Sequence, residues 1–201
     1  AGLPCYITPH AVYSVSQPLF HLIKEQIRSS SVTSLHFLES DDERKMAQGH
    51  IETAITLSNL TSRLILVHNT VLSEDEMEKL ASVPSIWFCL CPSSNMHISG
   101  KMPPVKFLAK ASGRIVAGTD SLASTGHLSI LGELKLLHEA APAIALDEII
   151  RWGTINGARA LEMDGALGSI EPGKKPGLLL IEKVDLTRLR LLPDSTVRRL
   201  L

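Results

Sequence analysis

The sequence predicts an α/β fold in which parallel strands alternate with helices. Short apolar runs recur along the chain, and longer amphipathic segments separate them. The runs are apolar almost throughout, which is typical of strands buried on both faces of a parallel sheet. Five such units are visible, and this number fits both an open doubly wound sheet and a (β/α)₈ barrel.

The expected elements follow in chain order. The five apolar runs that we expect as strands are residues 3–8, 32–37, 63–68, 85–91 and 114–119. The amphipathic segments that we expect as helices are residues 17–28, 41–58, 73–82, 102–111 and 128–139. Ser73 should cap the helix that follows it, because Glu76 completes a capping box.

The alternation ends after the fifth unit. Residues 146–161 predict a further helix that begins near Asp147, and the stretch "GALGSIEPGKKPG" predicts a series of turns. The apolar run at 178–182 is then a lone strand outside the alternation. We expect it in a small appended β element.

Composition excludes several classes of protein. The 201 residues are 44% hydrophobic and 20% charged, as in an ordinary globular domain, and the formal net charge of −1 gives no basic excess for nucleic acid. No apolar run reaches the roughly 18 residues that span a membrane, and the first residues lack the basic region of a signal peptide. The odd number of cysteines, three, argues against a disulfide framework and for a cytoplasmic location.

Polar side chains follow each predicted strand at its C-terminal end. In chain order they are His10, His36 with Glu39, His68, the run Ser93–Asn95, and Asp120. Taken singly, each is more often a loop or capping residue. The carboxyl ends of parallel strands meet at one edge, where active sites of barrels and open sheets lie. Five coincidences at one edge therefore indicate a functional site.

The residue types in this set suit metal-dependent hydrolysis. Imidazole and carboxylate groups bind transition metals such as zinc, and a bound metal lowers the pKa of water towards about 7. A nearby glutamate can then move the proton to a leaving group. The sequence has no G-x-S-x-G, Walker A or G-x-G-x-x-G motif, and it lacks the zinc nucleobase-deaminase signature. Cys89 and Cys91 share one face of an apolar run and are expected to pack in the core.

The stretch "SLHFLES" places His36 and Glu39 three positions apart. A continuing strand would send the two side chains to opposite faces. We therefore expect the strand to end near His36 or Phe37 and the chain to bend there. The bend should turn Leu38 away and bring Glu39 to the same pocket as His36.

Several motifs, taken together and in order, resemble those of the metal-dependent amidohydrolase superfamily. They are "HAVYS", "HFLES…E", "LVHN", "CPSSN", "GTDSLAST" and "INGARALEMDGALGSIEPGKKPGLLLIE". The resemblance is closest to the branch with adenosine-type and S-adenosylhomocysteine deaminases, guanine deaminase and triazine chlorohydrolases. It implies a (β/α)₈ TIM barrel with a small β-sandwich. Residues 1–160 would supply strands four to eight of the barrel, and residues 161–201 would return to the sandwich.

The resemblance also implies a role for each residue at the strand ends. One divalent metal ion is implied, zinc by default with iron as the alternative. Glu39 would transfer protons, and His68 would lie beside the reacting centre. The implied set comprises the metal ligands His36 and Asp120, the catalytic residues Glu39, His68 and Asp120, and the substrate-binding residues His10 and Asn95.

One departure from the family pattern concerns the metal. The H-x-H motif of the first barrel strand, which supplies two further ligands, is absent, since none of the eight histidines is followed by another two positions on. The first three strands are absent with it. We therefore expect this chain to be the C-terminal part of a longer enzyme. The 201 residues alone should bind metal weakly and show no turnover.

The expected reaction is hydrolytic deamination of a small heterocyclic substrate. The same residue types would also serve a chlorohydrolase or a cyclic-amide hydrolase, because the substrate pocket chooses the leaving group. A metal-free structural or binding domain is the alternative from another class. No nucleic-acid or membrane partner is expected, and an assembly of identical chains is compatible with the sequence.

Overall fold

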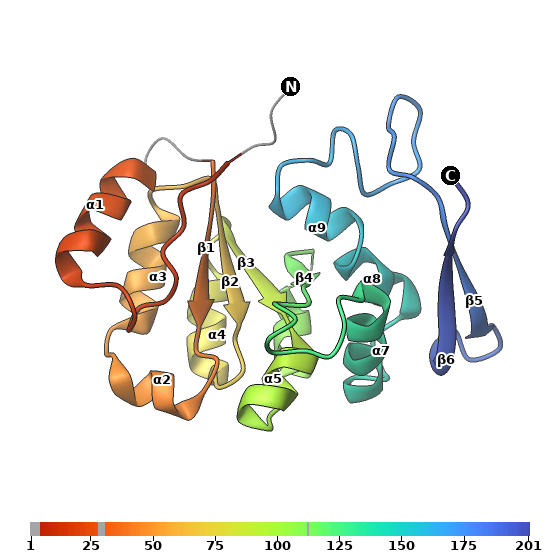
Figure 1. The fold of residues 1–201 in the computed structure, drawn as a ribbon, viewed down its shortest axis with the longest axis horizontal. Coiled ribbons are helices and arrows are strands. Elements are labelled where there is room, and N and C mark those ends of the chain that lie inside the picture. Colours follow the sequence, from red (N-terminus) through yellow and green to blue (C-terminus); the bar gives the residue numbers. More distant parts are fainter. Residues whose placement is uncertain (1–4, 28–30, 112) are drawn as a thin grey trace.

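The computed structural model describes residues 5–27, 31–111 and 113–201 (Figure 1). Its centre is a parallel sheet whose strands follow one another in chain order. The strands are β1 (Val32–Phe37), β2 (Arg63–His68), β3 (Ile86–Leu90) and β4 (Ile115–Ala117). Helices connect them, so the expected alternation of parallel strands and helices is confirmed. None of the helices in the described part of the chain is long and apolar enough to cross a membrane.

The expectation of a strand at residues 3–8 is wrong for its described part. Residues 5–10 form no strand, and an isolated bridge pairs Ala11 with His36 of β1. The Ser34 N–H, which a neighbouring strand would bind through its backbone, donates instead to the Thr8 hydroxyl at 3.0 Å. A side chain therefore replaces the backbone ladder at this edge. Residues 3 and 4 lie outside the described part.

Three expected helices form close to their predicted bounds. They are α1 (Gln17–Ile27), α4 (Glu74–Ala81) and α7 (Ile130–Ala140). The capping box of α4 is confirmed: the Ser73 hydroxyl accepts from the Glu76 N–H, and the Glu76 carboxylate accepts from the Ser73 N–H.

Two long helices that the sequence predicts are each broken in two. Residues 41–58 form α2 (Asp41–Met46) and α3 (His50–Ser58), because Gly49 adopts a left-handed conformation at φ 74°. Residues 146–161 form α8 (Leu146–Trp152) and α9 (Ile155–Ala160), with the break at Gly153 and Thr154.

Between β3 and β4 the helical segments also differ from prediction. Residues 102–111 hold only the short α6 (Val105–Leu108) and the 3₁₀ turn η1 (Ala109–Ala111). The sequence pattern missed α5 (Pro92–Ser99), which is rich in serine and asparagine. Pro92 in the first turn and Gly100 after the last were its signals.

The sheet buries side chains on both faces. One face carries Leu35, Leu66 and Phe88, which are fully buried against the surrounding helices. The other face carries Ile65 and Trp87, in a smaller cluster that α9 covers through Ala160. Cys89 and Cys91 are half-buried and buried, as expected for core residues.

The chain ends in an antiparallel hairpin of β5 (Leu179–Asp185) and β6 (Arg190–Arg199). The strand expected at 178–182 is thus present, but it is not alone, because residues 190–199 pair with it. The hairpin lies at the opposite end of the molecule from α1 (Figure 1). It is tied to α7, where the Lys135 ammonium donates to the Pro193 carbonyl at 2.7 Å.

Candidate metal and catalytic site

Three ionisable side chains converge at the carboxyl edge of the sheet. His36 lies near the end of β1, His68 is the last residue of β2, and Asp120 follows β4. One ligand atom from each lies within 4.8 Å of the others. Because β1 and β2 pair in parallel with Phe37 opposite His68, both imidazoles reach the same edge. The structure thus brings the two sequence-predicted ligands, His36 and Asp120, together with His68.

These three residues fit a divalent transition metal. Two imidazole nitrogens and one carboxylate oxygen form a donor set that zinc and iron accept. Beside them, the Glu39 Oε1 atom is buried and has no hydrogen-bond partner within the described residues. It lies 3.5 Å from Nε2 of His68. A buried carboxylate oxygen of this kind is costly unless it has a further partner, such as a bound ligand.

The turn that delivers Glu39 has the form expected from the sequence. Strand β1 ends at Phe37, and Leu38 adopts a left-handed conformation at φ 50° with its side chain fully buried. This conformation is uncommon for a residue with a side chain. It reverses the local direction of the chain and places Glu39 beside His68. The predicted bend after His36 is therefore confirmed.

Burial sets the protonation of the acid and the two imidazoles. It raises the pKa of Glu39, so this carboxyl keeps its proton closer to neutral pH than an exposed glutamate does. Burial also lowers the pKa of His36 and of His68, with mutual repulsion among the histidines adding to the effect at His36. Both imidazoles therefore favour the neutral form, which is the form that binds metal.

Asp120 has the opposite preference. Burial by itself would raise the pKa of its carboxyl, but hydrogen bonds from the hydroxyls of Ser124 and Ser94 outweigh that effect and lower the pKa. The Ser94 hydroxyl donates to Oδ2 at 2.8 Å, and the Ser124 hydroxyl donates to the same oxygen. Asp120 therefore favours its charged form, whereas the neighbouring Glu39 and the two histidines favour their neutral forms.

Asn95 stands behind His68. Its side chain is fully buried, and its Oδ1 lies 2.8 Å from Nδ1 of His68. Because an amide oxygen only accepts hydrogen bonds, Nδ1 carries the proton and Nε2 is left with a free lone pair. The backbone here is strained, with His68 at φ 80° and Asn69 at φ 57°. Helix α5 thus fixes the tautomer of the histidine.

His10 lies at the exposed rim of the site. Its ring packs edge-on against His36 at a centroid distance of 4.6 Å, and its Nδ1 lies 2.8 Å from the Ser14 hydroxyl. The structure therefore brings His10 to the same cluster as the three converging groups. The backbone N–H of Ser93 donates a hydrogen bond to the buried carboxylate of Glu133 at 2.9 Å.

The sequence motifs include two residues that support the site, Ser124 and Glu43, but the sequence alone predicted no role for either. Ser124 was hidden in the run "SLAST", where a serine after an aspartate looks like an ordinary turn residue. Glu43 lies in the charged run "DDERK", which resembles an exposed helix start, yet its side chain is 3% exposed. The S-x-x-E spacing from Ser40 was the available signal.

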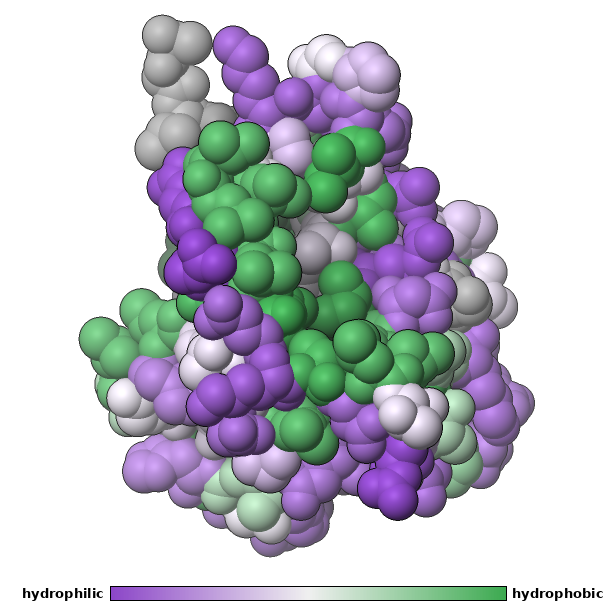
Figure 2. Space-filling view, turned by 90° about the vertical axis from the view of Figure 1, so that its right-hand side faces the viewer, coloured by the Kyte–Doolittle hydropathy of each residue, from purple (hydrophilic) through white to green (hydrophobic). Residues whose placement is uncertain are grey.

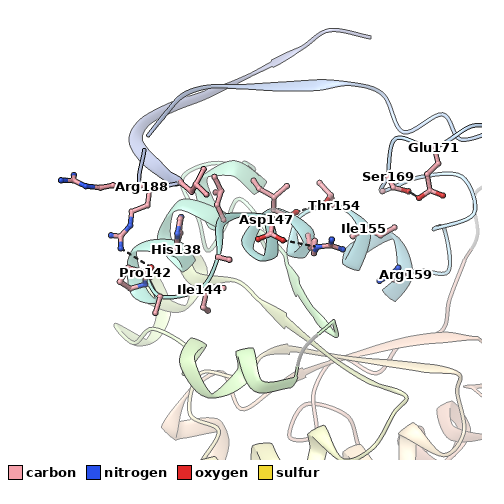
Figure 3. A pocket seen from close by; sticks show the side chains of 18 residues that line it. His138, Pro142, Ile144, Asp147, Thr154, Ile155, Arg159, Ser169, Glu171 and Arg188 are labelled. Atoms are coloured by element: carbon pink, nitrogen blue, oxygen red, sulfur yellow. Dashed lines mark hydrogen bonds and ion pairs between the residues drawn. The ribbon is translucent and has the colours of Figure 1, made fainter. Parts of the chain in front are cut away.

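A separate cavity of about 1090 Å³ lies away from the strand ends. It is lined by α8, α9, the loop after α7 and the hairpin turn, and includes Ile144, Asp147, Arg159 and Arg188 (Figure 3). None of the residues predicted from the sequence to act in the site lines it. Apolar side chains gather on this side of the molecule (Figure 2).

Comparison with known proteins finds a family model and several relatives that match the chain. Residues 4–198 match the model of the amidohydrolase family. The chain is 28% identical over 203 residues to 5-methylthioadenosine/S-adenosylhomocysteine deaminase of Pyrococcus abyssi, with 94% of this chain and 46% of that protein covered. The chain thus spans a little under half the length of this curated relative.

Solved structures agree with this match. An adenosine deaminase from Xanthomonas campestris with bound zinc superposes with a TM-score of 0.69 at 28% identity, over 87% of this chain and 43% of that one. Guanine deaminase from E. coli gives a TM-score of 0.71 at 19% identity, over 88% and 44%, which shows likeness of fold alone. The parallel sheet and its helices therefore form part of the barrel of such enzymes.

Proposed function

The chain belongs to the amidohydrolase family, and from this premise we propose that the protein is a metal-dependent hydrolase that deaminates a heterocyclic substrate. The observation that carries the proposal is the convergence of His36, His68 and Asp120 within 4.8 Å, with Glu39 3.5 Å from His68. The deaminase from Pyrococcus abyssi and the zinc-containing adenosine deaminase support the same reaction class.

His36 and Asp120 are the residues that would hold the ion, with zinc as the default and iron as the alternative. When bound, such an ion acts as a Lewis acid and makes water a stronger nucleophile near neutral pH. The described residues supply these two ligands, and a ring nitrogen of His68 lies within 4.8 Å of the ligand atoms of both.

The remaining residues manage protons. Asp120, held ionised by two serine hydroxyls, accepts a proton from the attacking water. The free Nε2 of His68 orients that water toward the ring carbon bearing the amino group. Glu39, whose pKa is raised by burial, donates a proton to a ring nitrogen. Water adds to the ring carbon, and the proton held by Asp120 then passes to the amino group, which leaves as ammonia. The remaining proton of the added water returns to Glu39, so that a carbonyl remains on the ring.

Substrate binding falls to the rim of the site. The exposed ring of His10 stands against His36 and offers a flat face and a hydrogen-bonding nitrogen to a heterocycle. Asn95 acts on the substrate through His68, because its own side chain is fully buried behind that ring. A planar, nitrogen-rich substrate matches this combination.

The experiment that tests the function uses the protein expressed from its complete reading frame. Metal content is measured by mass spectrometry, and ammonia release is assayed against a panel of aminopurines, pterins and cyclic amides. We expect stoichiometric metal and ammonia from an aminated heterocycle. Absence of stoichiometric metal would overturn the proposal. Chloride release from chlorotriazines without deamination would redirect it to dechlorination.

A further inference from the structure

Glu43 holds the turn that carries Glu39. Its two carboxylate oxygens accept separate backbone hydrogen bonds, from the Leu38 N–H at 2.9 Å and from the Glu39 N–H at 2.8 Å. The side chain is 3% exposed and belongs to α2, the helix that follows the turn. A carboxylate that accepts two backbone N–H groups makes charge-assisted hydrogen bonds and fixes their orientation.

The carbonyl side of the same turn is held by β2. The Asn69 N–H donates to the Phe37 carbonyl at 2.9 Å, and the Val71 N–H donates to the Leu38 carbonyl at 3.0 Å. The turn is therefore bonded on both sides, but only its N–H side depends on a side chain. A left-handed conformation is unfavourable for a residue with a side chain such as Leu38, so it persists only where its surroundings impose it.

Glu43 is itself held in place. The neighbouring Arg44 ties α2 to the loop after β2, because its guanidinium donates to both carboxylate oxygens of Glu76 at 2.8 and 2.7 Å and to the Val71 carbonyl at 2.5 Å. On the inner side, Nε2 of His50 lies 3.7 Å from Oε1 of Glu43. The carboxylate thus has a single position from which to hold the turn.

These contacts differ from those of an ordinary helix cap. In a capping box, the third-position glutamate bonds the N–H of the capping residue. Here the Ser40 hydroxyl does cap α2 by accepting from the Glu43 N–H at 3.2 Å, but the Glu43 side chain reaches further back, to Leu38 and Glu39. Its bonds therefore serve the site turn.

We propose that Glu43 is a positioning residue that aims the Glu39 carboxyl at the reacting centre, a role that rests on the proposed function. Without it, the Leu38 turn can relax toward an ordinary conformation and carry Glu39 away from His68. A misplacement of about 1 Å in a reacting group can slow an enzyme by about 10²-fold. Removal of the two backbone bonds should therefore act on the rate through Glu39.

A double-mutant cycle tests this coupling in the protein from its complete reading frame. Glu43→Gln keeps the size of the side chain but loses one acceptor oxygen, and we expect kcat to fall about 10–100-fold with little change in KM. In Glu39→Gln, kcat should fall further than in Glu43→Gln. The double variant should have the same kcat as Glu39→Gln alone. Asp42→Asn is the matched control, since it removes an exposed charge from the same turn of α2.

Amide hydrogen exchange provides a readout that does not depend on activity. In Glu43→Gln, the amides of Leu38 and Glu39 should exchange at least about 10-fold faster, while those of β2 keep their protection. Asp42→Asn should leave the exchange rates of the Leu38 and Glu39 amides, and the protection of β2, unchanged. If Glu43→Gln fails to fold, Glu43→Asp replaces it, because the shorter carboxylate keeps the charge and loses reach.

The outcomes separate the two proposals. If Glu39→Gln retains full activity, the proposed function fails. If Glu39→Gln is slower but still measurable and the two substitutions multiply in the cycle, Glu43 acts independently of Glu39 and the positioning role is overturned. Unchanged exchange at Leu38 and Glu39 overturns it as well. Equal rates in the double and single Glu39 variants, with faster exchange, support it.

Discussion

The strand-end site and the hairpin with its cavity both contain left-handed backbone, but they use it differently. In the hairpin, Lys183 adopts φ 55° beside a register shift and Leu189 adopts φ 52° near the turn, and both side chains are exposed. At the strand ends, His68 and Asp120 adopt φ 80° and 60° with their ionisable groups directed at one another. Left-handed residues form a turn in the hairpin, whereas at the strand ends they orient the ionisable side chains toward one another.

Charge burial separates the regions further. Charged residues around the cavity are exposed and form surface ion pairs, as with Arg151 and Asp147 at 3.9 Å. At the strand ends, the Glu39 carboxyl is 18% exposed and its inner oxygen lacks a partner within the described residues. Buried, poorly paired ionisable groups reduce stability, so their presence points to function.

The largest effect should come from Glu39. In the full-length protein, Glu39→Gln should lower kcat by about 10²–10⁴-fold, because the proton donor is lost. The free energy of unfolding should stay the same or rise, since a mostly buried ionisable group is replaced by a neutral amide of the same size. Steady-state kinetics and urea unfolding check both expectations. Activity within threefold of the parent would remove the strand-end site from consideration as the catalytic centre.

Truncation of an apolar side chain should lower the free energy of unfolding more in the sheet than in the hairpin. Leu66→Ala, in the fully buried face of β2, should lower the free energy of unfolding by about 2–5 kcal/mol. Leu179→Ala in the hairpin, where the side chain is 62% exposed, should change it by less than about 0.5 kcal/mol. Urea titration of the two variants measures the difference. Similar losses would mean that the hairpin packs as tightly as the sheet.

A smaller effect on activity is expected at Asn95. Asn95→Ala removes the partner of the His68 Nδ1–H and should reduce kcat about 10–100-fold, because the imidazole loses the hydrogen bond that orients it. Asn95→Asp keeps an acceptor oxygen and should retain more activity than the alanine variant. Ser99→Ala, which loses only a bond to the Asn95 carbonyl, is the control. Equal rates for the aspartate and alanine variants would contradict the orienting role.

The smallest effect should be the pH dependence of the Arg44–Glu76 pair. Hydrogen bonds from Arg44 lower the pKa of Glu76 from 4.5 to about 2. Because the folded-state pKa lies below the unfolded one, the contribution to stability is complete above pH 4.5 and is lost as the pH falls toward 2.

The Arg44 side chain is 38% exposed, so we expect Glu76→Gln to cost only about 1 kcal/mol at pH 7. The difference in the free energy of unfolding between this variant and the parent should disappear as the pH is lowered. Chemical unfolding at pH 7 and pH 3 measures it. The fully exposed Asp42–Lys45 pair gives the comparison, and Asp42→Asn should show almost no gap at either pH. A gap that persists at pH 2 would contradict the assignment to Glu76.

The fold was predictable where local pattern governs it. Apolar runs, caps and turn residues indicated β1 to β4 and the bounds of α1, α4 and α7 without tertiary information. The prediction failed where one glycine or one side chain decided the outcome. Gly49 divided a long amphipathic segment, and the Thr8 hydroxyl took the Ser34 N–H that a first strand would have bound.

What the sequence determined by itself was the identity of the reactive groups and the edge on which they meet. Strands that run in parallel bring their carboxyl ends together, so order along the chain was enough to predict that His36, His68 and Asp120 are neighbours. Only the tertiary structure decided that three ligand atoms lie within 4.8 Å and that Glu43, hidden in a charged run, holds Glu39 in place. Such contacts depend on strand register and on where a helix packs, and these are set by the whole core and not by local sequence.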